Sequence, residues 1–173
     1  MKRRGKIRGL AWLAAALTLA VALGLCARQW AFGTLRVAGT SMRDTLTGGD
    51  IALVTRFDYL NGGAPKRFEV VECRFPGRGD TYIKRVIGLP GEKIAFVGGA
   101  LFVDGAAVAE PYVFSRTQDY SILLGEDEYL VLGDNRADSY DSRMADMGPV
   151  GPDAFLGRVR WIIWPLGRFG PVQ

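Results

Sequence analysis

The chain has 173 residues, which is the length of one domain of ordinary size, or of one domain with an appendage. Hydrophobic residues make up 49% of the chain and charged residues 23%, so it has material for a packed core and is not disordered throughout. It contains no histidine. The Ser-His-Asp triad, the Cys-His dyad and His-containing zinc sites are therefore excluded, and any acid–base chemistry must use Lys, Asp, Glu, Tyr or Cys.

Charge is distributed unevenly along the chain. Residues 1–43 contain eight basic residues and no acidic residue, whereas the other 14 basic residues and all 18 acidic residues follow them. The net charge of +4 therefore arises in the N-terminal segment, and the larger part of the chain is mildly acidic. Because nucleic-acid-binding proteins usually carry their positive charge on the folded domain, this distribution argues against a nucleic-acid partner.

An uncharged stretch rich in Leu and Ala, residues 9–27, follows five basic residues within positions 2–8. As a helix, these 19 residues span about 28 Å, close to the thickness of the hydrocarbon core of a bilayer. The sequence therefore predicts one transmembrane anchor helix at residues 9–27.

The basic residues that precede the anchor predict its orientation. They hold residues 1–8 in the cytoplasm as a tail and place residues 28–173 outside, which is a single-pass type II topology. A cleavable signal peptide is the alternative, because Ala22-Leu23-Gly24 resembles a small-x-small cleavage site.

Residues 28–173 contain short apolar or alternating runs separated by turn residues, a pattern typical of antiparallel β structure. Tight hairpins are predicted at Gly98-Gly99 and at Asp104-Gly105. We expect an all-β antiparallel domain, barrel-like or built of two packed sheets, in which Cys73 is a small core residue rather than a nucleophile. The candidate strands are Leu35–Val37, Ile51–Phe57, Glu69–Phe75, Thr81–Ile87, Lys93–Val97, Ala100–Val103, Ala107–Val108, Tyr129–Leu132 and Leu156–Trp164.

Three segments contain residue types that can do chemistry. The first has Ser41 beside Met42, the second has Lys84 on a predicted strand among apolar neighbours, and the third is the polar run Gly133–Arg143. Taken singly, each has an ordinary explanation, because strand lysines usually extend to solvent and polar runs are usually loops.

Together the three segments resemble the motifs of the bacterial type I signal peptidases, or leader peptidases. That family has Ser-Met-x-Pro-Thr-Leu followed by Gly-Asp, then Lys-Arg-Val-Ile-Gly-Leu-Pro-Gly-Glu, then Gly-Asp-Asn-Arg-x-x-Ser-x-Asp-Ser-Arg. The resemblance extends from about Leu35 to Pro165. The matching residues are Ser41-Met42, Thr45-Leu46, Gly49-Asp50, Lys84–Glu92 and Gly133–Arg143.

Two positions depart from the family pattern. Asp44 stands where the family has proline, and Gly39 stands where some members have a serine whose hydroxyl helps to stabilise the oxyanion. The resemblance therefore implies an oxyanion hole that uses backbone N–H groups, notably that of Ser41.

The resemblance implies a membrane-bound serine endopeptidase that removes signal peptides from exported preproteins, cleaving after small residues at positions −1 and −3. Ser41 would be the nucleophile and Lys84 the general base, through an acyl-enzyme and with no metal or cofactor. A neutral Lys84 requires that its pKa fall from about 10.4 to roughly 7–8, so we expect this side chain to be buried.

The family also implies supporting roles for other residues of this chain. Ser139 would orient Lys84, while Asp141, Arg143 and Asp134 would hold the third segment against the active site. Shallow apolar substrate pockets would be lined by Leu35, Val37, Met42, Leu46 and Ile83.

The resemblance places the protein in the bacterial cytoplasmic membrane, with preprotein signal peptides and membrane lipid as partners and the secretion translocon nearby. Three alternatives remain: a processing peptidase specialised for one secreted, pilus or conjugation protein, a self-cleaving repressor-type Ser-Lys protease, and an inert membrane-anchored binding protein of the same fold. The predicted anchor and the third motif argue against the repressor type, and the presence of Ser41, Lys84 and Ser139 argues against the inert protein.

Overall fold

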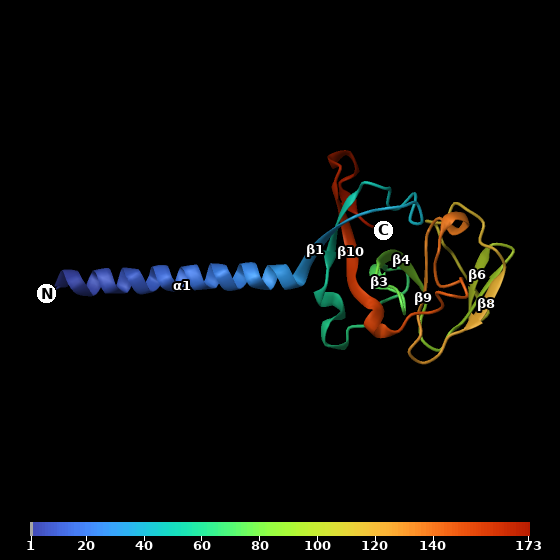
Figure 1. Cartoon of the computed structure of the whole chain (residues 1–173), viewed down its shortest axis with the longest axis horizontal. Helices are drawn as coiled ribbons and strands as arrows, with labels where there is room; N and C mark the ends of the chain where they lie inside the picture. Colours follow the sequence, from blue (N-terminus) through green and yellow to red (C-terminus); the bar gives the residue numbers. More distant parts are fainter. Residues whose placement is uncertain (1) are drawn as a thin grey trace.

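A long helix and a β domain make up the molecule. The computed structural model describes the backbone of residues 2–173 and the side chains of residues 12–25, 31–59 and 62–173. Helix α1 (Lys2–Ala31) extends away from the β domain (Figure 1). Where side chains are described, no helix combines the length and the hydropathy of a membrane span. The anchor expected at residues 9–27 is therefore not confirmed, and its residues 9–11 and 26–27 lie outside the described side chains.

The β domain consists of two antiparallel sheets, which confirms the predicted all-β antiparallel class. The larger sheet has the order β1 (Phe32–Arg36), β2 (Ile51–Thr55), β10 (Phe155–Trp164), β3 (Val70–Arg74), β4 (Thr81–Gly88) and β9 (Leu130–Leu132), with β11 (Gly170–Pro171) paired to β10. The smaller sheet has the order β7 (Ala106–Val108), β6 (Ala100–Val103), β5 (Lys93–Val97) and β8 (Tyr120–Leu123).

Each of the nine predicted strands overlaps an observed one. Gly98-Gly99 joins β5 to β6 and Asp104-Gly105 joins β6 to β7, as predicted. Strands β8 and β11 were not predicted. Strand β8 has four residues between polar loops and is held by pairing with β5, and β11 has two residues, one of them proline. Strands β8 and β11 both form because they pair with another strand of the domain. No local sequence pattern encodes such pairing.

Three hydrophobic clusters form the core. The first lies between the sheets and joins Ile87, Leu130 and Leu132 of the larger sheet to Ile94 and Phe96 of the smaller one. Alternation along each strand turns these side chains to the same face, so the two sheets bury their apolar faces against each other.

A second cluster packs the segment after β1 onto the larger sheet. Val37, Met42 and Leu46 are buried there against Val54 of β2 and Val159 of β10. The residues on either side of Ser41 are thereby anchored in the core. The third cluster contains Val71, Cys73 and Phe75 near β3, with Val86 and Val131.

Part of one edge of β4 has no neighbouring strand. Strand β3 pairs with β4 along Thr81–Arg85, but β9 pairs on the other side only from Arg85 to Gly88. The outer edge of β4 from Thr81 to Lys84 therefore has no strand partner among residues 2–173. Lys84 lies at the end of this unpaired stretch.

Candidate active site

The structure brings Ser41, Lys84 and Ser139 together from three distant segments. Ser41 lies in the turn that follows β1, Lys84 is on β4, and Ser139 follows the short 3₁₀ helix Arg136–Asp138. Lys84 Nζ donates hydrogen bonds to Ser41 Oγ at 2.8 Å and to Ser139 Oγ at 3.3 Å. A hydroxyl and an amine are therefore in position to exchange a proton.

Lys84 is buried, as the sequence analysis required. Its exposed fraction is 2%, and Ser139 of the third motif contacts its Nζ. Burial lowers the pKa of Lys84 below its ordinary value of 10.5, against the opposing effect of the Asp141 carboxylate. Its cross-strand partner is Val71, and no carboxylate forms an ion pair with it among the described residues. Burial therefore makes the neutral amine easier to form than in an exposed lysine.

Asp141 and Arg143 fix the shape of the third motif. Both carboxylate oxygens of Asp141 accept hydrogen bonds from the Arg143 guanidinium, at 2.8 and 2.9 Å, and the Gly133 N–H donates to the same carboxylate at 3.0 Å. Burial alone raises the pKa of Asp141, but the hydrogen bonds and charge of Arg143 outweigh it and hold that pKa below the ordinary range. Asp141 thus stays charged and keeps the loop closed.

The third motif also packs directly against the nucleophile segment. Asn135 N–H donates to the Ser41 carbonyl oxygen at 3.0 Å. A Cβ on Gly133 would lie 2.4 Å from that carbonyl oxygen and 2.2 Å from Ser139 Oγ. Only glycine permits this approach, because such separations are far inside van der Waals contact.

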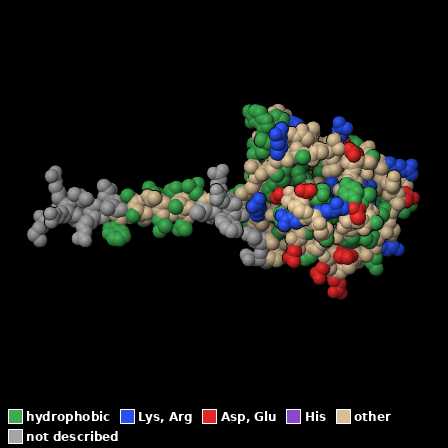
Figure 2. Space-filling view, in the orientation of Figure 1, with side chains coloured by type: hydrophobic (Ala, Val, Ile, Leu, Met, Phe, Trp, Pro, Cys, Tyr) green, Lys and Arg blue, Asp and Glu red, His purple; other side chains and the backbone are tan. Residues whose placement is uncertain are grey.

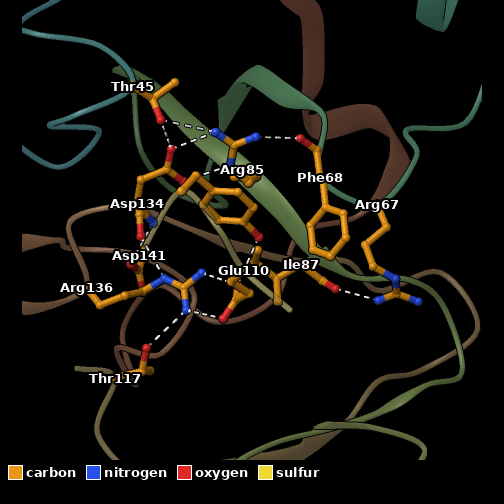
Figure 3. Close-up of polar contacts among 12 residues, drawn as sticks. Thr45, Arg67, Phe68, Arg85, Ile87, Glu110, Thr117, Asp134, Arg136 and Asp141 are labelled. Atoms are coloured by element: carbon orange, nitrogen blue, oxygen red, sulfur yellow. Dashed lines mark hydrogen bonds and ion pairs between the residues drawn. The ribbon is translucent and has the colours of Figure 1, made fainter. Parts of the chain in front are cut away.

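Asp134 does not contact Lys84 but forms a buried ion pair with Arg85. The guanidinium donates to both carboxylate oxygens at 2.8 and 2.7 Å, and the two side chains are 1% and 0% exposed. Figure 3 shows Thr45, four residues beyond Ser41, donating to the same carboxylate at 2.5 Å. Asp134 therefore links the third motif to both the lysine strand and the nucleophile segment.

Sequence reasoning assigned no role to Arg85. The guanidinium also donates to the Phe68 carbonyl oxygen at 2.8 Å and lies over the Tyr112 ring, with its Cζ 3.9 Å from the ring centroid. One feature of the sequence could have drawn attention to Arg85: it directly follows Lys84 on a strand. Because successive strand residues point to opposite faces, its side chain points to the face opposite Lys84. Only the structure shows that Asp134 meets it there.

A second buried ion pair was also not predicted. Arg136 donates to both carboxylate oxygens of Glu110, at 3.0 and 2.5 Å, and to Thr117 Oγ1 at 3.1 Å (Figure 3). These contacts tie the third motif to the segment between β7 and β8. Glu110 lies outside every motif, so nothing local in the sequence marked it.

A cavity of about 240 Å³ adjoins Ser41 and Lys84. Four of the five predicted pocket residues line it, and Leu46 does not. Leu46 is fully buried in the second core cluster, because its N–H bonds to the Met42 carbonyl oxygen and the chain turns inward there. The lining residues are Leu35, Arg36, Val37, Ala38, Gly39, Ser41, Met42, Glu72, Thr81, Tyr82, Ile83 and Lys84.

The backbone beside the nucleophile has two residues with positive φ. Gly39 has φ +85° and Asp44 has φ +82°. A proline ring holds φ near −65°, so the turn at Asp44 has a conformation that proline cannot adopt. Aspartate tolerates the left-handed region better than most residues.

Cys73 is a core residue, as predicted. It is fully buried, and burial raises the pKa of its thiol to about 12, so the nucleophilic thiolate is disfavoured. Cys26 lies outside the described side chains.

Comparisons with known proteins agree with the motifs. The family described as "Signal peptidase, peptidase S26" matches residues 10–164. Signal peptidase I of Bacillus caldolyticus is 32% identical over 185 residues, covering 98% of each chain. Signal peptidase IB of Staphylococcus aureus is 33% identical, covering 77% of this chain and 78% of that one.

A solved structure shares the fold. The crystal structure of a signal peptidase I from Enterococcus faecalis V583 is similar with a TM-score of 0.50 and 31% identity, covering 54% of this chain and 95% of that one. The family match extends over most of the sequence, and the Bacillus caldolyticus relative aligns over 98% of its length. The chain therefore belongs to the bacterial type I signal peptidases, serine peptidases of family S26.

Proposed function

We propose that this signal-peptide-removing peptidase works through a Ser-Lys dyad, with Ser41 as the nucleophile and Lys84 as the general base. The observation that carries the proposal is the 2.8 Å contact between Lys84 Nζ and Ser41 Oγ at a buried amine. Because the chain has no histidine, another group must accept the serine proton. A lysine with a lowered pKa can do so near neutral pH.

The reaction proceeds in two steps. Neutral Lys84 takes the proton from Ser41 Oγ as that oxygen attacks the scissile carbonyl carbon, and then donates the proton to the departing amine. Water, deprotonated by the same lysine, hydrolyses the acyl-enzyme and frees Ser41. Ser139, 3.3 Å from Lys84 Nζ, acts as a positioning residue that holds the amine toward Ser41.

Backbone N–H groups stabilise the oxyanion in this proposal. The Ser41 N–H has no hydrogen-bond partner among the described residues, and Gly39 offers no hydroxyl. A preorganised N–H donor aimed at the developing oxyanion lowers the barrier because it needs no reorganisation during the reaction.

The substrate lies extended along β4. The outer edge of Thr81–Lys84 has no strand partner in the described structure, so a peptide can add there as a further strand. In an extended peptide, the side chains at −1 and −3 point to the same side. The 240 Å³ cavity beside Ser41, walled by Val37, Met42 and Ile83, suits small side chains at those positions.

The enzyme acts at a membrane surface, with α1 as its anchor. Two groups of exposed apolar side chains support this proposal, since large exposed apolar areas mark interaction sites. Hydrophobic side chains occur along the described part of α1 (Figure 2). The exposed groups are Trp12, Leu13, Leu17, Leu19, Val21, Leu23 and Leu25 on α1, and Trp161, Trp164, Leu166 and Phe169 on the β domain.

Cleavage of a preprotein with an Ala-x-Ala site by the purified full chain in detergent tests the dyad. Ser41→Ala and Lys84→Ala should each lower kcat/KM at least about a thousandfold while the protein stays folded. Ser121→Ala and Lys93→Ala, at exposed positions of the smaller sheet, are matched controls and should keep parental activity. Parental activity in either dyad variant would refute the proposal.

A further inference from the structure

Glu72 is the unexpected residue of the substrate cavity. The walls are only partly apolar, and three charged side chains line them: Arg36, Glu72 and Lys84. Lys84 is engaged with two serines. Neither Arg36 nor Glu72 has a side-chain hydrogen bond or an ion pair among the described residues, so they do not neutralise each other at contact distance.

The position of Glu72 follows from the strand register. On β3 it stands directly opposite Ile83 of β4, and residues opposite each other in an antiparallel pair share a face. Val71 and Cys73, its neighbours in the chain, point the other way into the third core cluster. Glu72 is therefore directed to the cavity side of the sheet, beside Ile83.

The Glu72 carboxylate is available to a ligand. Within the described part of the chain, Ser115 Oγ is the sole buried side-chain polar atom without a partner. The Glu72 oxygens also lack a partner but are not in that buried class, so they are accessible to solvent, and Glu72 lines the cavity. A substrate group that donates a hydrogen bond can replace that water, whereas an aliphatic group that displaces it leaves the carboxylate unsatisfied.

The direction of β4 assigns the subsite. The scissile bond must lie beside Ser41 and Lys84. Along the outer edge of β4 toward Thr81, each further substrate residue therefore lies farther from these two side chains. Glu72 is level with Ile83, one register position from Lys84 in the direction of Thr81. Of the two side chains on that face, −3 is the one farther from the scissile bond.

We propose that Glu72 is a specificity-determining residue that makes the −3 subsite of this enzyme favour a hydrogen-bond-donating side chain over an aliphatic one of the same size. The proposal rests on the proposed peptidase function and adds a polar preference to its small-residue rule. A substrate hydroxyl at −3 donates to the Glu72 carboxylate, and a bond to a charged acceptor is stronger than one between neutral groups.

Threonine and valine at −3 provide the test, because they are nearly isosteric and differ in the hydroxyl. The readout is the ratio of kcat/KM for a Thr-x-Ala preprotein to that for its Val-x-Ala counterpart. The two preproteins compete in one reaction for the full-length enzyme. The parent should favour threonine by roughly fivefold, the size expected for a charge-assisted hydrogen bond weakened by solvent.

Variants then assign that preference to Glu72. Glu72→Leu should remove it, Glu72→Gln should keep part of it because the amide oxygen still accepts, and Glu126→Leu at an exposed turn should leave it unchanged. Unchanged Thr/Val discrimination in Glu72→Leu, or a loss confined to position −1, would overturn the inference. Ala-x-Ala cleavage by every variant checks folding, and parental failure on that substrate would instead count against the proposed function.

Discussion

Asp44 illustrates how much one backbone angle matters beside the nucleophile. The family pattern has proline here, yet Asp44 has φ +82° in a turn that Leu46 N–H closes onto the Met42 carbonyl oxygen. The substitution is therefore more than a change of side chain, because it comes with a turn that proline cannot form.

Asp44→Pro should destabilise the fold and lower activity. The ring forces φ to the opposite sign, so the turn must rearrange and carry Ser41 away from Lys84, at a cost of about 2 kcal/mol or more in the free energy of unfolding. Asp44→Gly should be neutral or stabilising, since glycine adopts this φ without strain. Chemical denaturation and preprotein cleavage measure both effects, and a fully active, stable Asp44→Pro variant would refute this account of the turn.

The candidate site residues could be predicted from the sequence where they belong to a motif. Ser41, Lys84 and Ser139 were identified from the sequence, and the structure brings them together. Leu46 was misplaced because a motif gives order along the chain but not the direction of a side chain. Glu72 lies outside every motif, and its place in the cavity depends on pairing between two strands.

At the scale of elements, a buried ion pair joins the loop after β9 to β4 and to the nucleophile segment. Asp134 and Arg85 are bidentate, and Thr45 donates to the same carboxylate. Removal of one partner from such a pair leaves an uncompensated buried charge, which is far more costly than loss of a surface pair.

Asp134→Ala should lower the free energy of unfolding by about 3–5 kcal/mol. Its matched control is Asp146→Ala, because Asp146 pairs with Arg78 at the surface, where side-chain exposure is 55% and 39%. That change should have little effect, since water and salt screen exposed pairs. Equal losses in the two variants on urea denaturation would contradict the role assigned to the buried pair.

The elements themselves were mostly predictable, because alternation of apolar residues and Gly-containing turns mark strands locally. Strands β5 and β6 have the predicted bounds. Strand β8 was missed because its alternation is only four residues long and its stability depends on β5. The pairing of β10 with both β2 and β3 is likewise a long-range property that no window of sequence contains.

On the scale of the whole molecule, the described part of α1 and the β domain differ in how much apolar surface they expose. In Figure 1 the helix extends away from the domain. The apolar side chains of its described residues, such as Leu17 and Leu23, are exposed. The described β domain buries most of its apolar residues in three core clusters and exposes a few, Trp164 and Leu166 among them. The proposed membrane anchor would account for the exposed apolar side chains in the described part of α1.

Charged substitutions in α1 test the anchor. Leu17→Lys combined with Val21→Lys should release the protein from membranes on alkaline extraction, because a lysine near the bilayer centre costs about 2.5–3.5 kcal/mol. Leu123→Lys is the control: it is 70% exposed on β8, at the end of the domain away from α1 (Figure 1), and should leave membrane binding unchanged. Retention of the double variant in the membrane fraction would contradict the proposal.

The pH dependence of kcat/KM tests the central claim, that a neutral, buried Lys84 is the base. Protonated Lys84 cannot accept the Ser41 proton, so activity should rise with pH through the pKa of Lys84, with a midpoint below 10.5 because burial lowers that pKa. The Asp141 carboxylate raises the same pKa, so Asp141→Asn should move the midpoint to lower pH. A midpoint at or above 10.5, or activity that does not rise with pH, would contradict the account.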